Sequence, residues 1–169
     1  MTETTTVTRD EILLDALRFN LRLLHELTMR YGVEARPARN QDDRPTIDCP
    51  DDVRQLLAPE MAGLAQEQMR VLLLDSRRHV VGQRVIYQGN VCAIMVRPAE
   101  VLRPAVVAAI PHLLICHNHP SGDPTPSADD TALTRKLVAA ADLLGIQIVD
   151  HVVIGSDRVV SLKEDGLMP

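Results

Sequence analysis

At 169 residues, of which 46% are hydrophobic and 24% charged, the chain has the size and composition of one main globular domain with a short appended segment. Its net charge of -5 and its 2% of aromatic residues disfavour nucleic-acid binding, which depends on basic surfaces and on rings that stack against bases. The sequence has no apolar run of membrane-spanning length and no signal-peptide pattern at its start, which predicts a cytoplasmic protein that does not enter the membrane.

The N-terminal part of the chain predicts one long amphipathic helix followed by a linker. Residues 8–31 carry apolar side chains at helical spacing and are followed by a glycine that can end the helix. The next residues are polar and are broken by Pro37 and Pro45, which is typical of a linker. We therefore expect a helix and linker over residues 1–46 and one folded domain over residues 47–169. The helix is the candidate contact for a homo-oligomer.

The domain is expected to begin with two short helices and a group of strands. Helices are predicted over 50–58 and 59–67, because each range begins with a proline, which suits the first turn of a helix. Strand-like runs follow at 69–75, 80–87 and 92–96. The first two runs are separated by a turn of hairpin length, which predicts that they pair antiparallel.

The second half of the chain alternates between helices and strands. Its predicted elements are a helix over 99–110, a strand over 113–116, a helix over 128–143, and strands over 146–154 and 159–162. The stretch between the first of these strands and the second helix is rich in proline and glycine, which predicts a tight loop. This mixed order predicts an α/β or α+β fold with a curved central sheet.

Two histidines follow the strand predicted over 113–116. Alternate side chains of a strand share one face, so His117 and His119 are expected to point the same way. Ser127 and Asp130 open the next helix and, at a spacing of three residues, can both face the end of the strand. Two imidazoles and one carboxylate, with a position left for water, are the usual ligands of a catalytic zinc ion. The pattern therefore predicts a metal site.

Structural roles would also explain each of these residues. Two neighbouring histidines are often hydrogen-bonded polar residues at the edge of a sheet. Ser127 and Asp130 match a capping box, in which a serine begins the helix and an acid three residues later bonds back to it. Asp129 can interact with the helix dipole, which leaves Asp130 able to serve both the cap and a metal. On the residues alone, both interpretations stay open.

The spacing of these residues is also that of a known family signature. His117, His119, Ser127 and Asp130 match the complete JAMM (MPN+) metalloprotease motif, which is H-x-H, seven residues, serine, two residues and aspartate. The runs HNHPSGDPTPSADD, VRPAEVLRPAV and LLGIQIVDHVVIG resemble the RadC family of bacterial MPN-like proteins. The resemblance covers roughly residues 50–165.

This resemblance implies a fold, a metal and an activity. The fold is a mixed α/β fold of the MPN/JAMM type, with a curved, mostly antiparallel sheet flanked by helices in a cytidine-deaminase-like architecture. His117, His119 and Asp130 would bind Zn²⁺ with a water molecule as the fourth ligand. Ser127 would help to stabilise an oxyanion, and a glutamate from an earlier strand edge would act as general acid/base. The implied activity is that of a metallopeptidase or isopeptidase acting on a peptide or protein.

The glutamate of this scheme lies outside the compact motif. The RadC-like frame around EQMRVLLLD places it at Glu67, directly before the first predicted strand. Glu60 and Glu100 are the alternatives. Glu100 falls inside a predicted helix, where an acid more often caps the helix or faces solvent. Glu67 is therefore the predicted general acid/base.

Two further polar residues, Asp150 and His151, match the RadC-like pattern but not the metal motif. A hydrogen bond from one of them to a metal ligand is one interpretation. Buried structural polar residues are the interpretation that we expect, which leaves both outside the predicted site.

Two other functions stand as alternatives to the peptidase. A non-catalytic MPN-like module would retain a metal and act in DNA repair or metabolism. Typical RadC-like proteins carry an N-terminal helix-hairpin-helix-like region, whose glycine spacing is missing from the first 45 residues here. A nuclease would need a basic groove, which the acidic composition disfavours.

Overall fold

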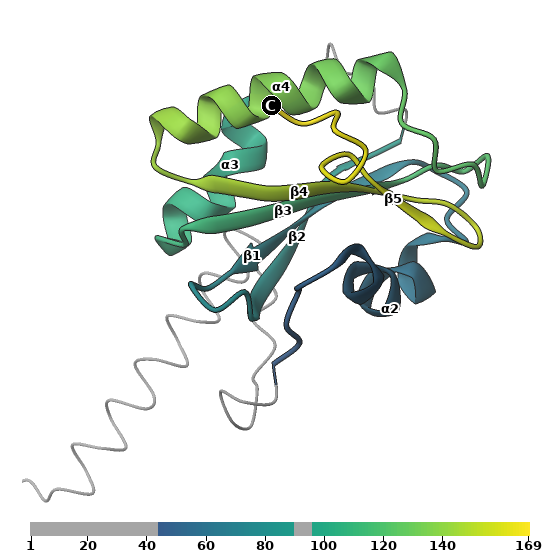
Figure 1. The fold of residues 1–169 in the computed structure, drawn as a ribbon, viewed down its shortest axis with the longest axis horizontal. Coiled ribbons are helices and arrows are strands. Elements are labelled where there is room, and N and C mark those ends of the chain that lie inside the picture. Colours follow the sequence, from purple (N-terminus) through teal and green to yellow (C-terminus); the bar gives the residue numbers. More distant parts are fainter. Residues whose placement is uncertain (1–43, 90–95) are drawn as a thin grey trace, which may run out of the picture.

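The computed structural model describes residues 44–89 and 96–169 (Figure 1). The helix predicted over 8–31 and almost all of the strand predicted over 92–96 lie outside the described residues. The division of the chain at residue 46 stays a prediction.

Three helices and five strands make up the described part of the chain. In chain order they are α2 (Pro50–Met61), β1 (Gln68–Leu74), β2 (Val80–Gln88), α3 (Pro98–Ala108), β3 (His112–Asn118), α4 (Ala128–Leu143), β4 (Gln147–Ile154) and β5 (Val159–Ser161). The strands form one open sheet in the order β2-β1-β3-β4-β5, in which β3 and β4 pair parallel and the other neighbours pair antiparallel. This confirms the predicted mixed α/β fold with a mostly antiparallel sheet. None of these helices in the described residues is long and apolar enough to cross a membrane.

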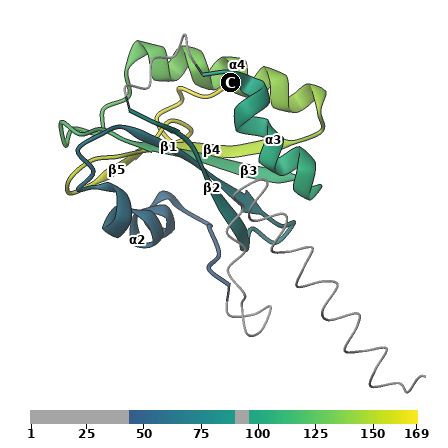
Figure 2. The same cartoon turned by 180° about the vertical axis from the view of Figure 1, so that it is seen from behind.

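Helices cover both faces of the sheet, with α3 and α4 on one face and α2 on the other (Figures 1 and 2). A hydrophobic core lies on each face of the sheet, and alternate side chains of β3 point into one core and then the other. Leu113 and Ile115 pack under α3 and α4. Leu114 and Cys116 pack toward α2 on the other face. Because both faces of β3 are covered, its residues 113–116 form a continuous apolar run that ends at His117.

One helix stands where the sequence predicts two. The prediction of separate helices over 50–58 and 59–67 is wrong, because α2 continues through Pro59. A proline inside a helix removes one backbone donor. However, Leu57 and Met61 are fully buried against the sheet on either side of it, and their burial outweighs the lost hydrogen bond.

The hairpin predicted for β1 and β2 is confirmed, and Asp75 holds its turn together. Its Oδ1 accepts hydrogen bonds from the backbone N–H groups of Arg77 at 2.9 Å and His79 at 3.0 Å. Its Oδ2 lies 3.1 Å from Nδ1 of His79 and 3.2 Å from Nη2 of Arg44. Partial burial by itself raises the pKa of Asp75, but the hydrogen bonds from His79 and Arg77 outweigh this and lower the pKa below its usual value.

We expect Asp75→Ala to lower the free energy of unfolding by about 2 kcal/mol at neutral pH, because two backbone donors lose their acceptor. Asp75→Asn keeps an amide oxygen and should cost less. The folded state has the lower pKa, so the stabilisation is complete above the unfolded pKa of about 4 and is lost as the pH falls through the folded value. Urea unfolding checks this. The difference in the free energy of unfolding between wild type and Asp75→Asn should become smaller near pH 3. A difference that grows there would contradict the assigned direction of the pKa shift.

Candidate metal centre

The two histidines of the motif come together at the end of β3. His117 continues the alternation of Leu113 and Ile115, is fully buried and faces the layer of α3 and α4. The side chain of His119, just beyond the strand, is 18% exposed. The Nε2 atoms of the two rings lie 3.1 Å apart. The prediction that both side chains point the same way is confirmed.

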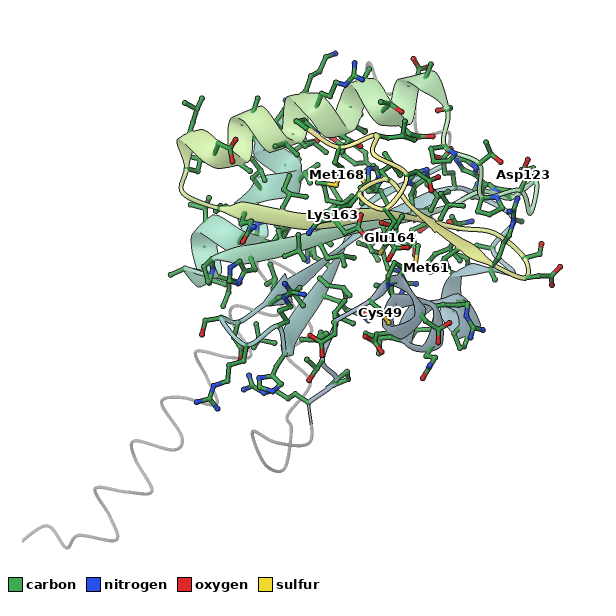
Figure 3. All side chains as sticks on the ribbon, in the orientation of Figure 1. Cys49, Met61, Asp123, Lys163, Glu164 and Met168 are labelled. Atoms are coloured by element: carbon green, nitrogen blue, oxygen red, sulfur yellow. The ribbon has the colours of Figure 1, made fainter. Side chains whose placement is uncertain are left out.

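The loop after β3 orients His119. Its backbone N–H donates to the carbonyl of Ile154 at 3.0 Å, and its Nδ1 lies 2.8 Å from the carbonyl oxygen of Asp123. Asp123 lies in the loop between β3 and α4, at the margin of the molecule (Figure 3). A carbonyl oxygen carries no hydrogen, so Nδ1 of His119 must donate the hydrogen of this bond. In the neutral ring, Nε2 then keeps its lone pair toward His117.

Close packing fixes this loop against the end of β4. Gly122 has a φ of 83°, and a Cβ on it would lie 2.4 Å from Oγ of Ser156. A Cβ on Gly155 would lie 2.4 Å from the carbonyl oxygen of Gly122 and 2.6 Å from Cδ of Pro124. The second clash involves backbone and a proline ring, so only glycine fits at Gly155. This packing supports the loop that orients His119.

The first turn of α4 brings Asp130 to the histidines and forms a capping box at the same time. Ser127 is the N-cap, and its Oγ accepts a hydrogen bond from the backbone N–H of Asp130 at 3.1 Å. Oδ2 of Asp130 in turn accepts from the N–H and the hydroxyl of Ser127, at 2.7 and 2.6 Å. The same carboxylate lies 3.2 Å from Nε2 of His117 and 3.6 Å from Nε2 of His119. The capping role and the position beside the histidines therefore coexist.

Asp130 is ionised at neutral pH. Burial raises the pKa of this carboxyl group, but its interaction with the imidazole of His117 and the hydrogen bonds from Ser127 outweigh burial and hold the pKa well below its usual value. A negative charge thus lies beside two imidazole nitrogens. Ser127 gives its one hydroxyl hydrogen to Asp130. It would have to turn away from Asp130 to stabilise an oxyanion.

Glu67 joins these residues from a distant part of the sequence. It directly precedes β1, which pairs antiparallel with β3 so that Met69 lies opposite His117. One ligand atom from each of four residues lies within 4.8 Å of the others, and these residues are Glu67, His117, His119 and Asp130. We call them the four-residue cluster. Ser127 lies at its border, through its bonds to Asp130.

Asn118, between the two histidines, holds the chain around Glu67. Its Oδ1 accepts from the backbone N–H of Gln68 at 2.8 Å, and its Nδ2 donates to the backbone carbonyl of Gln66 at 3.2 Å. The side chain is fully buried, which strengthens both bonds. It therefore ties both neighbours of Glu67 to the strand that carries the histidines. No local pattern assigns this role to Asn118, because it depends on the pairing of β1 with β3.

The alternative glutamates lie elsewhere. Oε2 of Glu60, in α2, is 2.5 Å from Nη1 of Arg70. Glu100 lies in the first turn of α3 and forms an ion pair with Arg97. Neither belongs to the cluster of ligand atoms in the described part of the chain. Of the three candidates, Glu67 is the one that the fold brings to the histidines.

His151 contacts the cluster from behind. It is fully buried in β4, with Nε2 2.9 Å from Nδ1 of His117 and Nδ1 2.6 Å from Oγ1 of Thr134. Burial lowers the pKa of His151 well below its usual value, so the ring is neutral. Asp150 is a buried structural residue, as expected, and accepts a hydrogen bond from Ser161 at 2.6 Å. His151, by contrast, forms a hydrogen bond with His117 of the motif, which is the first of the two interpretations that the sequence allowed.

The donor set of the cluster fits a zinc ion. Zinc binds nitrogen and oxygen ligands at about 2.0–2.2 Å in tetrahedral geometry, which places ligand atoms roughly 3.3 Å from one another. Nε2 of His117 lies 3.1 Å from Nε2 of His119 and 3.2 Å from Oδ1 of Asp130. Lone pairs and a carboxylate at such distances repel one another unless a proton or a cation lies between them. The arrangement is therefore suited to binding a cation.

A family model and a group of known proteins match most of this chain. The family model described as the RadC-like JAB domain matches residues 47–167. UPF0758 proteins of Listeria welshimeri, Clostridium beijerinckii and Roseiflexus castenholzii are 42%, 42% and 43% identical to it over 120, 122 and 126 residues. These matches cover 71%, 72% and 75% of this chain, and 54%, 53% and 54% of the relatives. The chain therefore spans about half the length of these relatives, whose names state no activity.

Proposed function

The chain belongs to the RadC-like JAB domain family, and we propose that it is a zinc-dependent metallopeptidase or isopeptidase that hydrolyses an amide bond of a peptide or protein. The observation that carries this proposal is the convergence of one ligand atom from each residue of the four-residue cluster within 4.8 Å. The residues of this cluster are of the types that a JAMM peptidase uses for its metal ligands and its general acid/base. Their proximity supports the assignment of each role.

Three residues of the cluster would hold the ion. Nε2 of His119 has its lone pair toward the cluster, because Nδ1 donates to the carbonyl of Asp123. Asp130 is ionised and lies 3.2 Å from Nε2 of His117. These three groups supply two neutral nitrogens and one negative oxygen, a common ligand set for catalytic zinc. When bound, zinc would lower the pKa of water in its open position toward about 7 and so supply a nucleophile at neutral pH.

Glu67 would act as the general acid/base. A carboxylate beside the attacking water takes a proton from it and returns the proton to the leaving amide nitrogen. Such a group must be held in place, because small displacements lower the rate strongly. The hydrogen bonds of Asn118 to Gln66 and Gln68 supply this support.

Ser127 would have a supporting role. Its hydroxyl donates to Oδ2 of Asp130 at 2.6 Å, which orients the carboxylate. A rotation of this hydroxyl toward the substrate would place a donor beside the carbonyl oxygen as it becomes negative. In either position Ser127 acts beside the groups that carry the reaction.

Removal of the metal tests this proposal. Wild-type protein is expected to bind one zinc ion per chain, measured by plasma mass spectrometry, and to cleave members of a library of internally quenched peptides or isopeptides. Treatment with 1,10-phenanthroline should abolish cleavage, and added zinc should restore it, because the nucleophile depends on the ion. A wild-type protein that binds no zinc contradicts the proposal. Cleavage that survives removal of all metal contradicts it as well.

A further inference from the structure

A chain of hydrogen bonds runs behind His117, away from the four-residue cluster. Nδ1 of His117 lies 2.9 Å from Nε2 of His151, and Nδ1 of His151 lies 2.6 Å from Oγ1 of Thr134. Oγ1 of Thr134 lies a further 2.6 Å from the backbone carbonyl oxygen of Asp130. All three side chains are fully buried, so water does not compete for these bonds. The positions of the hydrogens can therefore be worked out link by link.

The first link starts at the carbonyl of Asp130. A carbonyl oxygen only accepts, so the single hydroxyl hydrogen of Thr134 must lie in the bond to it. The hydroxyl oxygen then has no hydrogen left for His151 and can only accept. It follows that Nδ1 of His151 carries a hydrogen and donates it to Thr134.

The second link runs from His151 to His117. His151 is fully buried and its ring nitrogens face a hydroxyl group and an imidazole, an environment that favours the neutral ring. With a hydrogen on Nδ1, its Nε2 must accept. The donor is then Nδ1 of His117, whose Nε2 is left to face the cluster.

We propose that Thr134 and His151 are positioning residues that fix the tautomer of His117, so that its Nε2 presents a lone pair to the cluster. The hydrogen-bond chain stands on its own contacts, whereas its consequence for zinc rests on the proposed function. His119 reaches the same tautomer through the backbone carbonyl of Asp123. The tautomer of His119 is thus fixed by a backbone carbonyl, whereas the tautomer of His117 is fixed by side chains.

The hydroxyl of Thr134 is the group on which the chain depends. Without it, His151 would lose the acceptor for its Nδ1 hydrogen and would favour a hydrogen on Nε2. Nε2 of His151 would then donate to Nδ1 of His117, whose own hydrogen would move to Nε2 and face the cluster. A ring nitrogen that carries a hydrogen cannot bind a metal. Loss of groups that orient metal-ligating histidines typically lowers metal affinity by about 10- to 100-fold.

Thr134→Val and Thr134→Ser form a matched pair for the test. Valine keeps the shape of threonine and removes the hydroxyl, whereas serine keeps the hydroxyl. The zinc affinity of the full chain, measured by competition with a chromophoric chelator, should fall by about 10- to 100-fold in Thr134→Val and stay within about threefold of wild type in Thr134→Ser. Equal affinities for the two variants would overturn the proposal.

A second measurement reads the tautomer directly. Two-bond ¹H–¹⁵N spectra of the zinc-free wild-type chain should show His151 with its hydrogen on Nδ1, and Thr134→Ser should give the same pattern. A wild-type His151 with its hydrogen on Nε2 would overturn the proposal. This measurement needs no zinc, so a wild-type protein that binds no zinc would refute the proposed function while the spectra still decide the hydrogen-bond chain.

A second pair of variants guards against a loss of folding. Thermal unfolding of the zinc-free variants is followed by circular dichroism. If Thr134→Val does not fold, the comparison moves to His151→Gln and His151→Leu. The glutamine oxygen can accept from Nδ1 of His117 and should preserve zinc affinity better than leucine, which has no acceptor. Equal zinc affinities for these two variants would count against the role of His151.

Discussion

Replacing Glu67 by glutamine should lower amide hydrolysis by about 10²- to 10⁴-fold and leave bound zinc unchanged, because an amide cannot take the proton of the attacking water. Glutamine has the shape of glutamate, and Asn118 bonds to the backbone on both sides of this position rather than to its side chain. The change therefore removes the base and keeps its position. Cleavage of the peptide library by zinc-loaded protein gives the rate, and plasma mass spectrometry gives the zinc content.

Glu100→Gln is the matched control for this variant. Glu100, in the first turn of α3, forms an ion pair with Arg97 and lies outside the four-residue cluster, so its replacement should leave the rate at the wild-type level. If Glu67→Gln keeps zinc and the full rate, Glu67 is not the base. A wild-type protein that binds zinc but cleaves no member of the library would favour the non-catalytic metal-binding module. A large loss of rate in Glu60→Gln alone would transfer the role to Glu60.

His117→Ala should abolish zinc binding and the stabilisation that zinc gives to the folded protein. An ion that binds only the folded state adds about 2.7 kcal/mol to the free energy of unfolding at a free concentration one hundred times its Kd. Urea unfolding of the wild type should show this gain when zinc is added, and the variant should show none. Without zinc, the variant should also be less stable than wild type, because the buried ring leaves a cavity and His151 loses its partner at 2.9 Å.

His112→Ala is the control on the same strand. His112 begins β3, and its Nδ1 lies 3.1 Å from the carbonyl oxygen of Asp75, far from the cluster at the other end of the strand. Its loss should leave the stabilisation by zinc unchanged.

Asp130→Asn offers a second test, because an amide oxygen can still accept the capping hydrogen bonds while the negative charge is gone. Wild-type zinc affinity in both His117→Ala and Asp130→Asn would show that the cluster does not hold the ion.

Features that depend on residues close together in the sequence could be predicted from the sequence. The helix predicted over 128–143 has those bounds in the structure, and Ser127 caps it as its type and place indicate. The approach of His117 and His119 follows from the two-residue period of a strand. The hairpin of β1 and β2 follows from a turn between two strand-like runs. In each case, local geometry and hydrogen bonding decide the outcome.

The separate helices over 50–58 and 59–67 show where local rules fail. A proline predicts a helix start, because its missing N–H costs nothing in the first turn. Pro59 instead lies inside α2, between Leu57 and Met61, which are both fully buried. Burial against the sheet is a tertiary effect, and it exceeds the local cost of one hydrogen bond.

By itself, the sequence determined the fold class and the local half of the site, namely His117, His119 and the turn that holds Asp130. Glu67 entered only through the family resemblance, and the tertiary structure alone brought it to the histidines, together with the support of Asn118 and the contact of His151. The reason is that strand pairing joins residues far apart in the chain. Registers that differ by two residues share one alternation pattern, so only the packed sheet selects among them.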